Sequence, residues 1–220
     1  MFEQIRMLCG QARNPHLRAL LFAFLDDPEL VAGFLRAPAA KSIHHAFTGG
    51  LCEHTLSVLQ LGWRICDHYP QLDRDLVTAG CLLHDFGKAR EISSEPGFEY
   101  TDEGKLVGHL ILVCQLIREK ASRIPGFPRE LEWRITHLVA AHHGRFEYGS
   151  PKEPATLEAM VVHAVDELDT RMSSFAQLFA LAQGPWTDRK NPYGRQLLVP
   201  PAPAEDGRRF EGPGIYREVE

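Results

Sequence analysis

The spacing of the apolar residues constrains the fold of this 220-residue chain more than any other feature of its sequence. After Pro15, which suits the first turn of a helix, apolar residues recur at intervals of three and four: Leu17, Leu20, Leu21, Phe24 and Leu25. This spacing returns along most of the chain, and no alternating apolar and polar run of useful length predicts a strand. We therefore expect an all-α protein.

The same spacing predicts a series of further helices. They begin near Gly50, Leu72, Glu103, Leu131 and Pro154. The helix from Glu103 is expected to continue to Lys120. Gly87 and Gly144 stand where a glycine can end the helix before it.

Two of these helices carry apolar stripes that we assign to the core. In the helix from Glu103, the stripe contains Leu106, Leu110, Val113 and Ile117. The helix from Pro154 is expected to be the longest and to run to Leu181, with a stripe of Leu157, Val161, Ala164, Leu168 and Met172. Burial of one apolar face of each helix would hold the helices together.

The composition divides the chain into three predicted parts. Residues 1–40 are expected to form an N-terminal helical segment that packs on the core, and residues 41–183 the main helical domain. Residues 184–220 contain several prolines and glycines, so they are expected to form an irregular tail of extended chain or a short hairpin.

Charge and cysteine content exclude several classes of protein. The formal net charge is −5, so the surface lacks the basic excess of a protein that holds nucleic acid through its overall field. The five cysteines are odd in number and never spaced Cys-x-x-Cys, which favours free buried thiols in a reducing compartment. The sequence shows no leader and no apolar run near the roughly 20 residues of a membrane span. We expect a cytoplasmic protein that does not enter the membrane.

Histidine and aspartate residues interrupt the apolar faces of these predicted helices. His54 lies three residues after Leu51 and four before Val58, and His109 belongs to the stripe of its helix. Four more such residues fall at helix ends or on the longest helix: His84, Asp85, His142 and Asp166. Burial of imidazoles and carboxylates without partners costs on the order of a few kcal/mol each, and a metal ion would satisfy them together. Nitrogen and carboxylate ligands without thiolate suit Mn, Fe, Co, Ni or Zn.

The order of these residues resembles the signature of the HD-domain superfamily of metal-dependent phosphohydrolases. That signature is a histidine, a His-Asp pair and a later aspartate, which here are His54, His84 with Asp85, and Asp166. Residues 84–88 match the superfamily's His-Asp-x-Gly-Lys form. The resemblance implies an all-α HD-domain helical bundle, followed here by the irregular tail.

Further motifs resemble the catalytic half of the YhaM-like 3′-to-5′ exoribonucleases. They lie at residues 37–46, 49–55, 142–144, 149–152 and 186–189, and the similarity extends from Asn14 to Arg189. Members of that family carry an OB-type nucleic-acid-binding domain before the HD domain. For residues 1–40 of this chain we expect the helical segment instead.

The resemblance implies a site for two divalent transition-metal ions. The first ion would be held by His54, His84, Asp85 and Asp166, and the second would share Asp85 and add His109, His142 and His143. Lys88 would meet a phosphate oxygen, and Asp169 would act as a weaker ligand or orient one. A mononuclear centre with the three added histidines lining the pocket remains the alternative. His16, His68, His137 and His163 receive no role.

The implied function is hydrolysis of phosphodiester bonds at the 3′ end of single-stranded RNA or DNA, by attack of a metal-bound hydroxide. Asp85 and Lys88 would be the catalytic residues. Two other readings stay open: a phosphohydrolase of a small nucleotide or cyclic dinucleotide, and a non-catalytic HD signalling module.

Overall fold

Helices make up every named element in the described ranges of the chain, residues 1–39, 47–93 and 99–201 of the computed structural model. Their bounds are α1 (Phe2–Gly10), α2 (Pro15–Leu25), α3 (Pro28–Arg36), α4 (Gly50–His68), α5 (Arg74–Leu83), α6 (Lys88–Glu91), α7 (Asp102–Leu106), α8 (His109–Ser122), α9 (Arg129–Ala140), the 3₁₀ helix η1 (Phe146–Tyr148) and α10 (Leu157–Leu181). Within those ranges, β pairing is confined to isolated bridges. The all-α prediction is confirmed.

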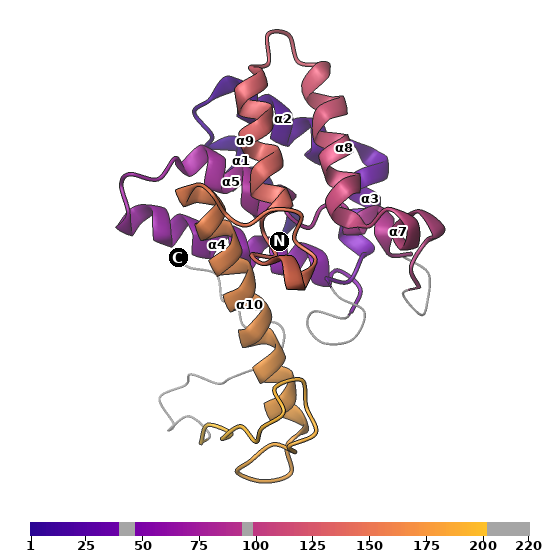
Figure 1. Ribbon diagram of the computed structural model, residues 1–220, viewed down its shortest axis with the longest axis vertical. Coiled ribbons are helices and arrows are strands. Elements are labelled where there is room, and N and C mark those ends of the chain that lie inside the picture. The colour runs from indigo at the N-terminus through magenta and orange to yellow at the C-terminus, as the bar shows by residue number, and fades with distance from the viewer. Residues whose placement is uncertain (40–46, 94–98, 202–220) are drawn as a thin grey trace. The chain divides into compact units, whose positions relative to one another are not determined.

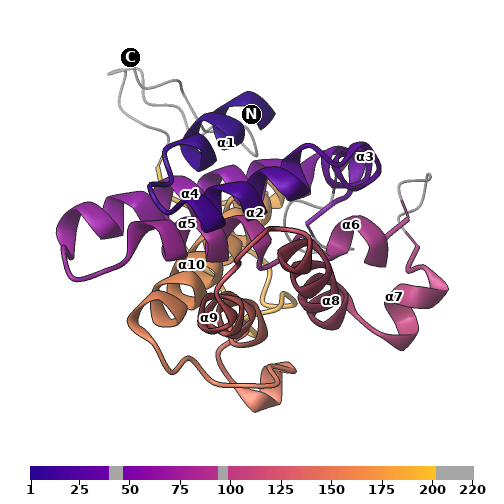
Figure 2. The ribbon, with the colours of Figure 1, turned by 90° about the horizontal axis from the view of Figure 1, so that it is seen from above.

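The chain divides into two compact units, and the boundary along the sequence lies between Asp169 and Thr170. In the first unit, α4 packs along α5, and α8 and α9 stand side by side as a helical pair (Figures 1 and 2). The helix α1 packs against α4 and α5, and α2 packs against α5. The predicted domain boundaries themselves stay predictions, and the boundary at residue 40 lies outside the described residues, as do residues 40–46 of the motif at 37–46.

Polar side chains set the observed starts of several helices. Asn14 accepts hydrogen bonds from the backbone at the start of α2, which begins with Pro15 as predicted. Asp73 caps α5 in the same way, so this helix starts two residues later than expected. The longest helix begins at Leu157 rather than Pro154, because the Thr156 hydroxyl accepts from Ala159 N.

The prediction of one helix from Glu103 to Lys120 is wrong, because the chain breaks between α7 and α8. Gly108 has φ +79°, a conformation open mainly to glycine. Leu106 is consequently 86% exposed and takes no part in a core stripe. His109 becomes the first residue of α8. Its backbone N–H donates to Glu91 Oε1 at 3.0 Å, so a carboxylate from another helix caps α8.

The predicted core stripe of α10 is wrong except at Val161, which is partly buried and packs against the core. Leu157, Leu168 and Met172 are each about half exposed, at 57%, 49% and 53%. The residues of this helix that enter the core of the first unit are instead Ala159, Val162 and Val165. The buried face is the one that also carries Asp166 and Asp169, so the polar residues and not the larger apolar ones identify it.

Two glycines predicted to end helices have different roles. Gly144 has φ +81°, the left-handed conformation expected there, although α9 already ends at Ala140. Gly87 has an ordinary φ of −62°. A Cβ atom at Gly87 would lie only 2.2 Å from His109 O, so glycine is needed there for the close approach of two backbones.

The second unit begins at Thr170 and includes the last turns of α10. Phe175 packs edge-on against Tyr193, with ring centroids 4.8 Å apart. Residues 185–199 double back on themselves, since Thr187 N donates to Leu197 O and Val199 N to Pro185 O, each at 2.9 Å. This is the short hairpin predicted for the tail; residues 202–220 of that tail lie outside the described residues.

The cysteines are free, as predicted, and all but the half-buried Cys114 are buried. Among the described residues, no helix has the length and apolar character required to cross a membrane.

Candidate metal centre

Four residues that are distant in the sequence form the first cluster: His54, His84, Asp85 and Asp166. Their candidate ligand atoms all lie within 4.8 Å of one another. His54 Nε2 is 3.2 Å from His84 Nε2 and 3.2 Å from Asp166 Oδ1. These are the four residues that the sequence assigned to one ion, and the structure brings them together.

The surrounding helices explain how polar groups come to be buried here. His54 lies on α4 and is fully buried, and His84 caps the C-terminus of α5 directly after the buried residues Leu82 and Leu83. Because both helices pack their apolar faces on each other, any polar residue on those faces must find partners inside the protein.

Hydrogen bonds orient both imidazoles of the first cluster. His84 Nδ1 donates to Cys81 O at 3.0 Å, and His54 Nδ1 donates to Asp169 Oδ2 at 2.7 Å. The other oxygen of Asp169 accepts from the Ser57 hydroxyl. With Nδ1 held by these acceptors, Nε2 is the nitrogen of each ring that faces the cluster. Asp169 therefore contacts the His54 ring on the side away from the cluster, and the choice between its two predicted roles stays a prediction.

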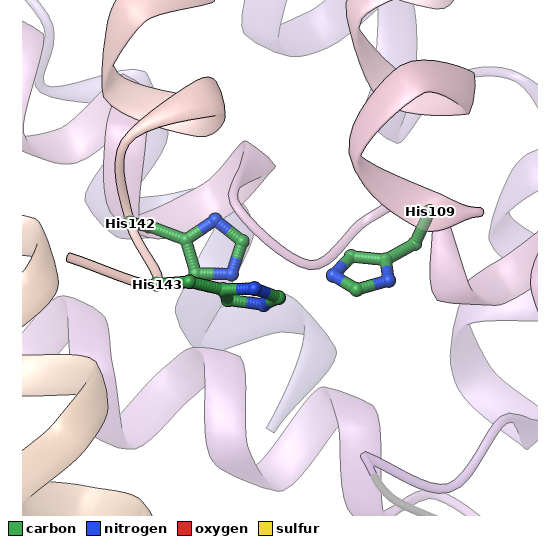
Figure 3. Close-up of side chains that lie close together, drawn as sticks. All are labelled: His109, His142 and His143. Carbon is green, nitrogen blue, oxygen red and sulfur yellow. The ribbon is translucent and has the colours of Figure 1, made fainter. Parts of the chain in front are cut away.

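The second cluster consists of His109, His142 and His143, whose rings converge in Figure 3. His109 comes from the start of α8, and the other two from the turn after α9. Each Nδ1 has an oxygen acceptor. For His142 this is Val139 O at 2.8 Å, for His143 Tyr148 O at 3.1 Å, and for His109 the Glu91 carboxylate at 3.1 Å. All three rings consequently offer Nε2.

Asp85 lies between the two clusters. Its Oδ2 is 3.5 Å from His84 Nε2, while its Oδ1 is 3.4 Å from His109 Nε2 and 3.5 Å from His142 Nε2. Within the described part of the chain, Asp85 Oδ1 and His109 Nε2 are buried and have no hydrogen-bond partner. A nitrogen and a carboxylate oxygen that face each other without a hydrogen bond fit the donor chemistry of a divalent transition metal.

Lys88 contacts the same carboxylate. Its ammonium donates to Asp85 Oδ2 at 2.6 Å and to Ala39 O at 2.7 Å. The predicted contact between Lys88 and a phosphate stays a prediction; the structure places the ammonium against a candidate metal ligand. The side chain is only 14% exposed, so its charge is held in a fixed place.

The sequence profile of the HD domain matches residues 51–171, a span that contains both clusters. The chain belongs to the HD domain family. It is 35% identical over 219 residues to the 3′-5′ exoribonuclease YhaM of Shouchella clausii, covering 99% of this chain and 64% of that protein. Over 86% of its length it is 38% identical to YhaM of Bacillus subtilis and 41% identical to YhaM of Bacillus pumilus, in each case across 60% of the relative. The chain thus spans less than two thirds of these relatives. No solved structure matches it.

The electrostatics of this HD domain suit cation binding. Burial lowers the pKa of His84 to about 4, and burial with the neighbouring His142 lowers that of His143 to about 4, so both rings are neutral near pH 7. Burial raises the pKa of Asp85, but the charge of Lys88 and the neighbouring histidines together outweigh burial and hold that pKa well below the usual range. Asp85 is therefore ionised.

The pKa of His54 is shifted in the opposite direction to those of His84 and His143. Burial lowers its pKa, but hydrogen bonds to Asp166 and Asp169 outweigh burial and raise the pKa to about 10. Burial likewise raises the pKa of Asp166, but its hydrogen bond with His54 and the surrounding histidines together bring that pKa below the usual range. Binding of a cation at the first cluster would have to displace the His54 proton, so metal affinity should depend on pH.

Two residues that organise the HD site escaped the sequence reasoning. Glu91 holds His109, and no spacing rule connects the short helix α6 with the start of α8. His163 donates from Nδ1 to His142 O at 2.7 Å, and its ring lies where a Cβ at Gly144 would stand, 2.3 Å away. A signal for His163 did exist, because it precedes Asp166 by three residues on one helix face.

Proposed function

We propose that this chain is a divalent-metal-dependent phosphodiesterase that shortens single-stranded RNA from its 3′ end. Membership of the HD domain family supports the reaction class. The relatives named 3′-5′ exoribonuclease YhaM, which match most of this chain, support the substrate and the direction. The observation that carries the proposal is the position of Asp85, with one oxygen facing each cluster.

In this proposal the site holds two ions of Mn, Fe, Co, Ni or Zn. The first cluster binds one, and the second cluster together with Asp85 binds the other. Two divalent ions bridged by a carboxylate lower the pKa of a water and neutralise charge on a phosphoryl group. Both unpartnered atoms described above, Asp85 Oδ1 and His109 Nε2, would gain a partner in this arrangement.

Lys88 supplies a fixed positive charge beside Asp85. Burial lowers the pKa of its ammonium, but Asp85 outweighs burial and raises that pKa above its usual value, so Lys88 is charged throughout the neutral range. Ala39 O holds the ammonium in place. A preorganised cation in a site of low exposure favours an anionic phosphodiester and stabilises charge that develops on it.

The test uses protein stripped with a chelator and reloaded, in separate samples, with Mn, Fe, Co, Ni or Zn. It is incubated with a 5′-labelled single-stranded RNA and with DNA of the same sequence. The expected product is a ladder of RNA shortened from the 3′ end, with release of mononucleotides. Asp85→Asn should abolish the ladder. Asp67→Asn is the matched control, because it makes the same change at an exposed carboxylate that pairs with Arg74.

An RNA that stays intact under all five metals would contradict the proposal. The second candidate, hydrolysis of a small nucleotide or cyclic dinucleotide, is favoured by the formal net charge of −5, which gives the chain no general attraction for a polyanion. A panel of nucleotides assayed with the same preparation separates the two functions.

A further inference from the structure

We propose that Glu91 is the positioning residue of the second cluster, which determines that His109 offers Nε2, and not Nδ1, to a bound cation. The inference rests on the proposed function insofar as the cluster is taken to hold a metal ion. In the described parts of the chain, no hydrogen bond or ion pair joins Glu91 to the first cluster, and its side-chain hydrogen bonds go to His109.

The carboxylate of Glu91 contacts His109 at its backbone nitrogen and at its ring Nδ1. Oε1 accepts from the backbone N–H of His109 at 3.0 Å and lies 3.1 Å from its ring Nδ1, while Oε2 lies 3.1 Å from Nδ1. Glu91 is the last residue of α6 and is only 8% exposed. Ring and backbone of one residue are thus fixed by a single buried side chain.

These contacts decide the tautomer of the imidazole. An ionised carboxylate only accepts hydrogen bonds, so the ring nitrogen beside Glu91 has to carry a proton. In the tautomer that these contacts select, the ring proton is at Nδ1 and Nε2 presents a lone pair to Asp85 Oδ1, which is 3.4 Å away. Two acceptors would face each other without a proton between them. A cation bound by both atoms removes that conflict.

The fold protects this arrangement. The short helix α7 covers Glu91, since a Cβ at Gly104 would lie 2.3 Å from Glu91 O and 2.9 Å from its Cγ. Thr101 N also donates to Glu91 O, at 3.0 Å. Gly108 is the N-cap residue of α8 and has no side chain that could accept a hydrogen bond from the first turn. The Glu91 carboxylate provides that acceptor for His109 N. The same carboxylate therefore caps the start of α8 and orients the ring of His109.

The alternative is that Glu91 only caps α8. Two variants test the proposal against this alternative, and the tautomer of His109 and the affinity for the second ion separate the two roles. Glu91→Ala removes both contacts with His109, whereas Glu91→Gln retains a carbonyl oxygen that can accept from the backbone and from Nδ1. Glu103→Ala is the matched control, because Glu103 is a partly exposed carboxylate on the neighbouring α7 that pairs with Arg90 at 3.1 Å.

The first measurement is ¹⁵N NMR of the histidine rings in metal-free protein. The expected result is a His109 ring protonated at Nδ1 in the unaltered chain, in Glu91→Gln and in Glu103→Ala. In Glu91→Ala the ring should no longer be confined to that tautomer. A His109 protonated at Nε2 in the unaltered chain would overturn the proposal, whether or not the protein is an enzyme.

The second measurement is a Co²⁺ titration followed by the absorption spectrum and by elemental analysis. We expect two ions per chain in the unaltered protein and in Glu103→Ala. In Glu91→Ala we expect the second ion to bind about 10 to 100 times more weakly, with Glu91→Gln nearer to the unaltered protein. Equal affinity in all variants, with only a loss of stability in Glu91→Ala, would leave Glu91 as a cap and overturn the proposal.

The two measurements fail independently. If the unaltered protein binds fewer than two Co²⁺ ions, the proposed two-metal function is wrong, while the NMR result still decides whether Glu91 sets the tautomer. If Glu91→Ala does not fold, Glu91→Gln carries the test: loss of the Nδ1 proton or of the second ion in that variant, despite its remaining acceptor, contradicts the proposal.

Discussion

The close approach of α6 and α8 predicts that Gly87→Ala will disturb both stability and metal binding. The added Cβ would lie 2.2 Å from His109 O, 2.9 Å from its carbonyl carbon and 3.0 Å from its Cα. All three are backbone atoms, so no rotamer change relieves the contact. The two segments must separate by roughly 1 Å before the distances become ordinary. His109 would then move away from Asp85.

Overpacking of this kind typically costs about 1–3 kcal/mol of folding free energy. For a chain of this size, each kcal/mol corresponds to about 2–4 °C in Tm, so a decrease of about 2–12 °C is expected for the metal-free protein. The displacement of His109 should also lower the affinity for the second ion in the Co²⁺ titration. A misplacement of about 1 Å near a reaction centre can cost about a hundredfold in rate.

The matched control is Gly184→Ala, because a Cβ there meets no atom within 4 Å and the residue has no positive φ. That variant should keep the Tm and the metal content of the unaltered chain. An unchanged Tm together with two bound ions in Gly87→Ala would show that the two backbones do not approach as described, and the reasoning would fail.

Three further predictions concern individual side chains. Lys88→Met should leave two ions bound and lower turnover by about 100- to 1000-fold, the effect of removing one preorganised charge; turnover equal to that of the unaltered chain would exclude Lys88 from the reaction. In metal-free protein, the free energy of unfolding should decrease as pH falls from about 6.5 toward 4. Burial lowers the pKa of His84 to about 4 in the folded protein, so over this range the unfolded chain binds a proton at His84 that the folded chain does not bind. Urea unfolding that shows constant or rising stability as the pH falls would contradict this. Asp169→Ala should weaken the first ion about 10- to 100-fold, since His54 loses the acceptor at its Nδ1, and an unchanged Co²⁺ affinity would mean that Asp169 does not orient the ligand.

The candidate ligands could be predicted from the sequence because they combine two independent signals. Histidines on apolar helix faces must be buried, and their order along the chain matches the signature of a known superfamily. His54 and His84 lie on helices whose apolar periodicity is regular, so the side on which they fall follows from spacing alone. The structure places both where that spacing indicates.

The break before α8 and the buried face of α10 could not be predicted in the same way. The break depends on Glu91, a carboxylate from another helix, and helix propensity contains no information about a remote cap. On α10, Leu168 and Met172 misled the assignment, because apolar residues are common on protein surfaces while a buried aspartate requires a partner. Weighting Asp166 and Asp169 above the leucines would have identified the inward face.

Anomalous X-ray scattering from crystals loaded with Mn²⁺ or Co²⁺ tests the central claim most directly. The account predicts two peaks of the bound metal, about 3.5–4 Å apart, with Asp85 between them. One peak should lie among the first cluster and the other among the second. A single peak, or two peaks that do not share Asp85, would contradict the two-metal site from which the proposed phosphodiesterase activity is derived.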